Sequence, residues 1–112
     1  MIGIGIDIVS ISRFKNIKKK DYPFWDKFYT KKEWEYCFSN VRFSEHLSGI
    51  FAAKEAVIKA CGKKEINNHG QIEIKHKVCG QPCVKIKGLP KQDIQISISH
   101  DSSFGIAIAF KR

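Results

Sequence analysis

The stretch Ile2-Gly3-Ile4-Gly5-Ile6-Asp7-Ile8-Val9 alternates strictly between isoleucine and a small or acidic residue. A period of two is typical of a β-strand with one buried face, which we assign to the isoleucines. A helix would carry glycine at every other step, which is costly in conformational entropy. Gly3, Gly5 and Asp7 share the opposite face, where the bare backbone of two glycines lets another group approach the carboxylate closely.

The segment 47–61 has the clearest helical pattern in the sequence, and Gly62 follows it as a stop signal. Its apolar residues recur at steps of three and four and form one stripe: Leu47, Ile50, Phe51, Val57, Ile58 and Cys61. The other side carries Ser48, Ala52, Glu55, Ala56 and Lys59. We expect the alanines on that side to let a strand or a ligand come near.

Short helices are predicted between these two segments. Ser10 or Ser12 can cap a helix that begins near Ile11, and Pro23 marks a break or restart. The aromatic-rich segment 25–38 contains Thr30 three residues before Glu33, which is a capping-box pattern.

Beyond Gly62 the period returns to two. Alternating segments cover 72–75, 84–87, 92–100 and 104–110, with turns at Gly80-Gln81-Pro82 and at 100–103. The order of one strand, helices and then several strands predicts an α+β fold with helices packed on a small antiparallel β-sheet. The length of 112 residues predicts a single domain, 1–112.

The charge is large and unevenly placed. The chain has 20 Lys+Arg against 11 Asp+Glu, a formal charge of +9, with a balance of +6 in residues 11–32, −1 in 33–61 and +5 in 62–92. Two basic zones predict contact with anions in two places. Two solvated surfaces, nucleic acid, a small polyanionic substrate and an acidic protein partner all remain compatible with charge alone, although the aromatic spacing does not match a base-stacking strand.

Composition excludes several classes. A hydrophobic content of 43% is too high for a disordered basic tail, and no apolar run is long enough to span a bilayer. We therefore expect a cytoplasmic protein, in which the four cysteines (Cys37, Cys61, Cys79 and Cys83) are buried thiols. Cys79 and Cys83 could hold zinc only with a second ligand pair, which the sequence lacks.

Two carboxylates carry the candidate chemistry. Asp7 either caps the following helix or pairs with Arg13, or it is a ligand of a hard cation such as Mg²⁺. Glu55 and Lys59 are spaced i, i+4 on one helix face, and they form either a surface ion pair or a second metal ligand with a phosphate-binding ammonium. Spacing alone leaves these alternatives open.

The segment Ser97-Ile98-Ser99-His100 ends a predicted strand and supplies three hydrogen-bonding side chains that suit phosphate or nucleotide contacts. It lacks the strained turn that a nucleophilic serine needs. His46, His69 and His76 have no clear pairing and receive no role.

Four segments together resemble the holo-[acyl-carrier-protein] synthases, the small bacterial type of 4'-phosphopantetheinyl transferase. They are Gly3–Val9 continuing to Arg13, Phe51–Ala56 with Lys59-Ala60, Gly80–Pro82 and Ser97–His100. The resemblance implies the fold of that family and an enzyme that moves 4'-phosphopantetheine from coenzyme A to a serine of apo acyl carrier protein. Adenosine 3',5'-bisphosphate would be released, and the product would support fatty acid biosynthesis.

The resemblance also implies roles for individual residues. Asp7 and Glu55 would bind Mg²⁺, Lys59 would contact phosphate, and Ser99 and His100 would lie near the coenzyme A nucleotide. Members of the family typically assemble as homotrimers with active sites between subunits. A carboxylate near the ion or a water on the ion would accept the serine proton.

The anions of such a reaction match the two basic zones. The first zone would steer the acidic carrier protein through Arg13, Lys15, Lys18, Lys19 and Lys20. In the second zone Lys63 and Lys64 would receive coenzyme A phosphates. The chain departs from the family at Ile50, where arginine is usual, and in residues 62–69, where the family has a glycine-rich stretch.

Overall fold

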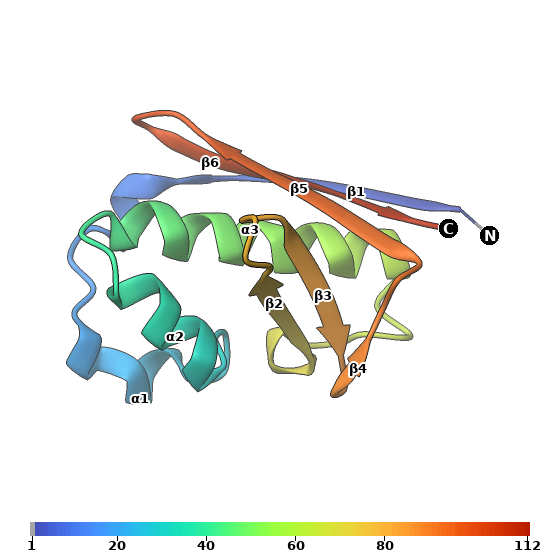
Figure 1. The fold of residues 1–112 in the computed structure, drawn as a ribbon, viewed down its shortest axis with the longest axis horizontal. Coiled ribbons are helices and arrows are strands. Elements are labelled where there is room, and N and C mark those ends of the chain that lie inside the picture. Colours follow the sequence, from blue (N-terminus) through green and yellow to red (C-terminus); the bar gives the residue numbers. More distant parts are fainter. Residues whose placement is uncertain (1) are drawn as a thin grey trace.

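The computed structural model describes residues 2–112. In chain order its elements are β1 (Gly3–Ser10), the 3-10 turns η1 (Ile11–Phe14) and η2 (Lys19–Asp21), α1 (Tyr22–Trp25), α2 (Lys31–Phe38), α3 (Phe43–Cys61), the 3-10 turn η3 (His69–Gln71), β2 (Ile72–His76), β3 (Pro82–Ile86), β4 (Leu89–Pro90), β5 (Ile94–His100) and β6 (Phe104–Lys111). The long helix α3 runs between a sheet on one side and the short helices and a second sheet on the other (Figure 1). This arrangement confirms the predicted α+β fold.

The strands divide between two antiparallel sheets. One has the order β1-β6-β5 and the other the order β2-β3-β4. The first and last strands of the chain therefore lie side by side, with Asp7 opposite Ala107 and Gly5 opposite Ala109. The predicted strands are all present, with ends shifted by at most a few residues.

The inner face of β1 lies directly on the backbone of α3. A Cβ atom at Gly5 would collide with the carbonyl oxygen of Ala56, and one at Gly3 would collide with that of Ala60. Only glycine allows this approach, and Ala107 and Ala109 continue the small-residue face on β6. The expectation that the alanine side of the helix admits a strand is confirmed.

The prediction that the isoleucine face of β1 is buried is wrong. Ile4, Ile6 and Ile8 are 63%, 54% and 58% exposed, and Phe104, Ile108 and Phe110 continue the same exposed face on β6. The isoleucines point outward because the glycine face is the one that can approach the helix closely. We call this outer surface the isoleucine–phenylalanine face.

The helical segments differ from the prediction mainly at their ends. Helix α3 begins at Phe43, a turn earlier than expected, and ends at Cys61 before Gly62. The helix predicted near Ile11 is only the 3-10 turn η1, and Pro23 lies in the first turn of α1. Within residues 2–112, none of the helices combines the length and the apolar character needed to cross a bilayer.

A buried ion pair joins α2, α3 and β2. The Nζ of Lys54 lies 2.6 Å from Oε1 of Glu33, and both side chains are almost completely buried. The other oxygen of Glu33 accepts a hydrogen bond from the amide of Ile74, and the capping box between Glu33 and Thr30 is confirmed. Burial raises the pKa of Glu33 and lowers that of Lys54, and in each case the partner's charge opposes the shift.

The ion pair gives a stability prediction. Lys54→Met should lower the free energy of unfolding by about 3 to 5 kcal/mol, because it leaves the buried Glu33 carboxylate without its cation. Lys59→Met is the matched control on the same helix, and its half-exposed ammonium should contribute less than about 1 kcal/mol. Urea denaturation of both variants measures the difference. An equal decrease in the free energy of unfolding in the two variants would contradict the prediction that the buried ion pair contributes more than the exposed one.

Candidate active site

Asp7 lies on the inner face of β1, beside α3. Its Oδ1 is 3.4 Å from Nζ of Lys59, and its side chain is 19% exposed. Its Oδ2 is buried and has no hydrogen-bond partner among residues 2–112. Burial raises the pKa of the Asp7 carboxyl; Lys59 opposes the shift, and the negative charge of Glu55 adds to it. The two carboxylates predicted from separate motifs therefore act on each other electrostatically.

Lys59 bridges the strand and the helix. Its Nζ donates to the carbonyl oxygen of Ile6 at 2.8 Å and to Asp7, while the side chain remains 52% exposed. The surface ion pair between Glu55 and Lys59, one of the two interpretations of their spacing, does not form. Lys59 instead pairs with Asp7, and its exposed ammonium can still meet an anion from solvent.

Glu55 is held by a residue that the sequence did not single out. Nε2 of His69 lies 3.1 Å from Oε1 of Glu55. The imidazole stacks on Phe51 with a centroid distance of 5.2 Å and an interplanar angle of 22°, and it packs against Phe28. His69 lies in a segment without periodicity, so no sequence signal indicated this contact.

Arg13 does not pair with Asp7, which removes one of the two structural alternatives for that carboxylate. Its guanidinium carbon instead lies 5.5 Å from the ring centroid of Phe51 and 5.7 Å from that of Phe14. This is cation–π geometry, and Arg13 remains exposed at the surface. Asp7 also does not cap the following turn, since the cap position is Ser10.

The other predicted site residues lie further along α3. Nδ1 of His100 is 3.5 Å from Oε2 of Glu45 near the beginning of the helix, about 15 Å along the axis from Glu55 at 1.5 Å per residue. Ser99 is exposed next to it. Lys63 and Lys64 are exposed just beyond the opposite end of the helix. One chain therefore spreads these groups along α3 rather than gathering them at Asp7.

A pocket of about 280 Å³ near His100 contains two more histidines. His76 stacks on Tyr36 at a centroid distance of 4.4 Å, and His46 meets the same tyrosine edge-on. Burial lowers the pKa of both His46 and His76. Glu45 opposes the shift of His46, whereas His100 adds to it. Ile50, the residue at which this chain departs from the family pattern, also lines this pocket.

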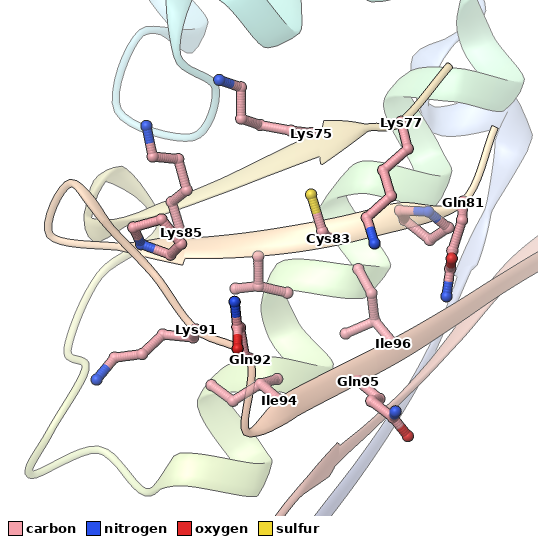
Figure 2. A pocket seen from close by; sticks show the side chains of 13 residues that line it. Lys75, Lys77, Gln81, Cys83, Lys85, Lys91, Gln92, Ile94, Gln95 and Ile96 are labelled. Atoms are coloured by element: carbon pink, nitrogen blue, oxygen red, sulfur yellow. The ribbon is translucent and has the colours of Figure 1, made fainter. Parts of the chain in front are cut away.

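A groove of about 450 Å³ lies elsewhere, between β3 and β5. Figure 2 shows Ile94 and Ile96 on one side of it, while Lys77 extends across β3 from the other. No carboxylate in the described part of the chain lines this groove. Four lysines of the second basic zone do: Lys75, Lys77, Lys85 and Lys91. Asp7 and Glu55 do not line this groove, so the volume of a pocket does not by itself identify the site of the two carboxylates.

The cysteines form no disulfide, but the prediction that they are buried holds only for Cys37. Cys79 is exposed, and Cys61 and Cys83 are partly exposed. Over residues 2–112, no cluster of three or more His, Cys, Asp or Glu side chains is arranged to hold a metal ion. Two carboxylates are nevertheless enough for Mg²⁺, which fills its remaining positions with water and substrate phosphates.

The chain is similar to known proteins over nearly its whole length. Residues 3–109 match the 4'-phosphopantetheinyl transferase superfamily. The holo-[acyl-carrier-protein] synthase of Thermodesulfovibrio yellowstonii is 42% identical over 106 residues, which cover 94% of this chain and 93% of that relative.

Solved structures agree with this match. The holo-[acyl-carrier-protein] synthase of Helicobacter pylori in complex with coenzyme A has a TM-score of 0.77 at 33% identity, covering 95% of this chain and 96% of that one. The synthase of Bacillus anthracis in complex with CoA (3',5'-ADP) also has a TM-score of 0.77, at 30% identity, covering 97% of this chain and 94% of that one.

The two partly buried histidines, His46 and His76, predict a loss of stability in mild acid. In the unfolded chain His46 and His76 take up protons near pH 6.5, while in the folded protein they do so only at lower pH. The unfolded state then binds more protons, so the free energy of unfolding should fall as the pH drops below about 6.5. Urea denaturation between about pH 7.5 and 5.5 tests this.

The double variant His46→Gln/His76→Gln should flatten that pH dependence. His100→Gln is the control, because His100 is exposed and its replacement should leave most of the slope. An unchanged slope in the double variant would contradict the assignment to these two residues.

Proposed function

The chain belongs to the 4'-phosphopantetheinyl transferase superfamily, and on that basis we propose that it transfers 4'-phosphopantetheine from coenzyme A to a serine of apo acyl carrier protein. The observation that carries the proposal is the pairing of Asp7 with Lys59 next to Glu55, with one buried Asp7 oxygen that has no hydrogen-bond partner among residues 2–112. We further propose that residues 1–112 form one transferase domain and that its product supports fatty acid biosynthesis.

The residues present fit Mg²⁺ as the cofactor. Asp7 and Glu55 would hold the ion, because Oδ2 of Asp7 is a hard anionic oxygen that is shielded from water and has no hydrogen-bond donor among the described residues. When bound, Mg²⁺ would neutralise the charge that develops as the diphosphate breaks. Bringing a cation to this place would also relieve the unfavourable burial of an ionised Asp7.

Lys59 would bind the transferring phosphate. The carbonyl oxygen of Ile6 and the Asp7 carboxylate orient its ammonium from one side, and the other side is open to solvent. The serine hydroxyl would give its proton to a nearby base, a carboxylate or a water. Its oxygen would form a bond to the β-phosphorus of coenzyme A as the bond from that phosphorus to the bridging oxygen breaks. Adenosine 3',5'-bisphosphate would leave with the bridging oxygen and its electron pair.

The remaining proposed contacts fit a site completed by a second subunit. Ser99 and His100 would contact the nucleotide, and Lys63 and Lys64 its phosphates, yet these pairs lie near opposite ends of α3. If one subunit contributed Ser99 and His100 and a neighbouring subunit contributed Lys63 and Lys64, the two pairs could lie close enough to bind the same coenzyme A. This agrees with the homotrimer that the family resemblance implies.

The isoleucine–phenylalanine face supports such an assembly. Ile6 lies opposite Ile108 and Ile4 opposite Phe110 on adjacent strands, so the exposed apolar side chains form one continuous surface. A contiguous exposed apolar surface of this kind is typical of contact with another protein surface. We assign it to the subunit contacts of the homotrimer.

The first basic zone would receive the carrier protein. Arg13, Lys15, Lys18, Lys19 and Lys20 are exposed, and Arg13 stands next to Phe51 on the side of the carboxylates. Positive charge here would raise the rate of encounter with an acidic carrier and guide its serine toward Asp7 and Glu55. The partners of the protein would thus be coenzyme A, acyl carrier protein and further copies of itself.

The transferase assignment is tested by the intact mass of apo acyl carrier protein before and after incubation with the protein, Mg²⁺ and coenzyme A. The wild type should convert the carrier to the phosphopantetheinylated form, and a chelator should stop the reaction until Mg²⁺ is restored. Asp7→Asn, Glu55→Gln and Lys59→Met should each reduce the rate by about 100-fold or more, because each removes a charge used in the transition state.

Glu35→Gln is the matched control, since Glu35 is an exposed carboxylate on α2. Full activity in both Asp7→Asn and Glu55→Gln would contradict the assigned roles. A wild-type protein that leaves the carrier mass unchanged, and instead binds nucleic acid with a steep salt dependence, would contradict the transferase assignment itself.

The assembly is tested by measuring the molar mass of the protein with light scattering during size-exclusion chromatography. Ile108→Asp should convert the trimer to a folded species of about one third of the wild-type mass, because it places a charge in the centre of the apolar contact. Val41→Asp changes an equally apolar but isolated exposed residue and should leave the mass unchanged. A monomeric wild type, or an Ile108→Asp protein that remains trimeric, would contradict this arrangement.

A further inference from the structure

We propose that His69 is a positioning residue that fixes the Glu55 carboxylate for the cation, an inference that rests on the proposed function. Lys59 and His69 each contact one of the two carboxylates. Lys59 holds one oxygen of Asp7, and His69 holds one oxygen of Glu55. Oδ2 of Asp7 and Oε2 of Glu55 make no hydrogen bond or ion pair with any other residue in the range 2–112, so one oxygen of each carboxylate is left for the ion.

The direction of the hydrogen bond follows from the chemistry of the two groups. An ionised carboxylate can only accept, so Nε2 of His69 carries the proton and donates it to Oε1 of Glu55 at 3.1 Å. This hydrogen bond restrains the carboxylate through one oxygen and leaves the other oxygen open. A lysine or arginine in the same place would compete with the cation for Glu55.

The imidazole is itself held firmly. It is only 15% exposed, and its ring is packed against Phe51 and Phe28 at centroid distances of 5.2 Å from each. The carbonyl oxygen of His69 accepts a hydrogen bond from Nζ of Lys54 at 3.3 Å. Because Lys54 is fixed by its ion pair with Glu33, the backbone of His69 is tied to the buried part of the molecule.

Glu55 needs this restraint more than Asp7 does. It is 32% exposed on a helix surface, and Lys59, one turn further along the helix, pairs with Asp7 instead. Without His69 its carboxylate would sample several rotamers, and only some of them would present an oxygen to the same ion as Asp7. Partners that orient metal ligands in this way commonly change metal affinity by about 10- to 100-fold when they are removed.

His69→Phe and His69→Gln separate the hydrogen bond from the packing. Phenylalanine keeps an aromatic ring between Phe51 and Phe28 but has no donor, whereas glutamine keeps a donor at a similar reach. His76→Phe is the matched control, because that histidine stacks on Tyr36 away from Glu55. Mn²⁺ binding is measured by electron paramagnetic resonance at about pH 8, where an ordinary imidazole is uncharged, with coenzyme A present and no carrier protein. Each variant is studied well below its own unfolding midpoint.

We expect His69→Phe to weaken Mn²⁺ binding by about tenfold or more, and His69→Gln to recover most of the affinity. In the carrier assay the Mg²⁺ concentration for half-maximal rate should rise in parallel for His69→Phe, with little change in the KM for coenzyme A at saturating Mg²⁺. His76→Phe should bind Mn²⁺ like the wild type.

Wild-type affinity in His69→Phe, or equal weakening in His69→Phe and His69→Gln, would overturn the inference, since either result means that the donor is not what matters. Both results leave the transferase assignment intact as long as the wild type modifies the carrier. A wild type that neither binds Mn²⁺ nor modifies the carrier would instead count against the proposed function.

Discussion

The close contact between β1 and α3 is the constraint on which the rest of the structure depends. At Gly3 and Gly5 the strand lies against the helix backbone, with no room for a Cβ atom at either position. This approach brings Asp7, the next residue on the same face, to the level of Glu55 and Lys59. A larger residue at Gly5 would move the strand outward, and the carboxylates from the two motifs would separate.

The opposite side of α3 packs into the core of the protein. Lys54, the neighbour of Glu55 in sequence, points into the core and forms the ion pair with Glu33 that joins α2 and β2 to the helix. The same lysine holds the backbone of the turn that carries His69. One helix thus connects a rigid buried network to a partly open site, and the turn at His69 transmits that rigidity to Glu55.

The sequence predicted the elements well but not the direction of their faces. The alternation in residues 2–9 fixes a strand, yet apolarity favours burying the isoleucines while steric fit favours burying Gly3 and Gly5. A single sequence does not tell whether an apolar face is covered by its own chain or by another copy. The contact between His69 and Glu55 was also unpredictable, because it depends on how a segment without periodicity folds back over fourteen residues. Strand and helix periods did place Asp7, Glu55 and Lys59 on defined faces, but spacing left their roles open, and only the resemblance to the family joined them as a set.

The burial of the Asp7 carboxylate opposes folding. Oδ2 of Asp7 is buried with no donor in the described range 2–112, which raises the free energy of the folded protein, and burial also raises the pKa of this carboxyl. If a protein donor satisfied that oxygen, the chain would gain stability but lose a place for a cation. Lys59 and His69 each restrain a carboxylate through one oxygen only. In the proposed site this unfavourable burial lies at an oxygen that would bind the cation, so part of the free energy lost in folding would be recovered on binding.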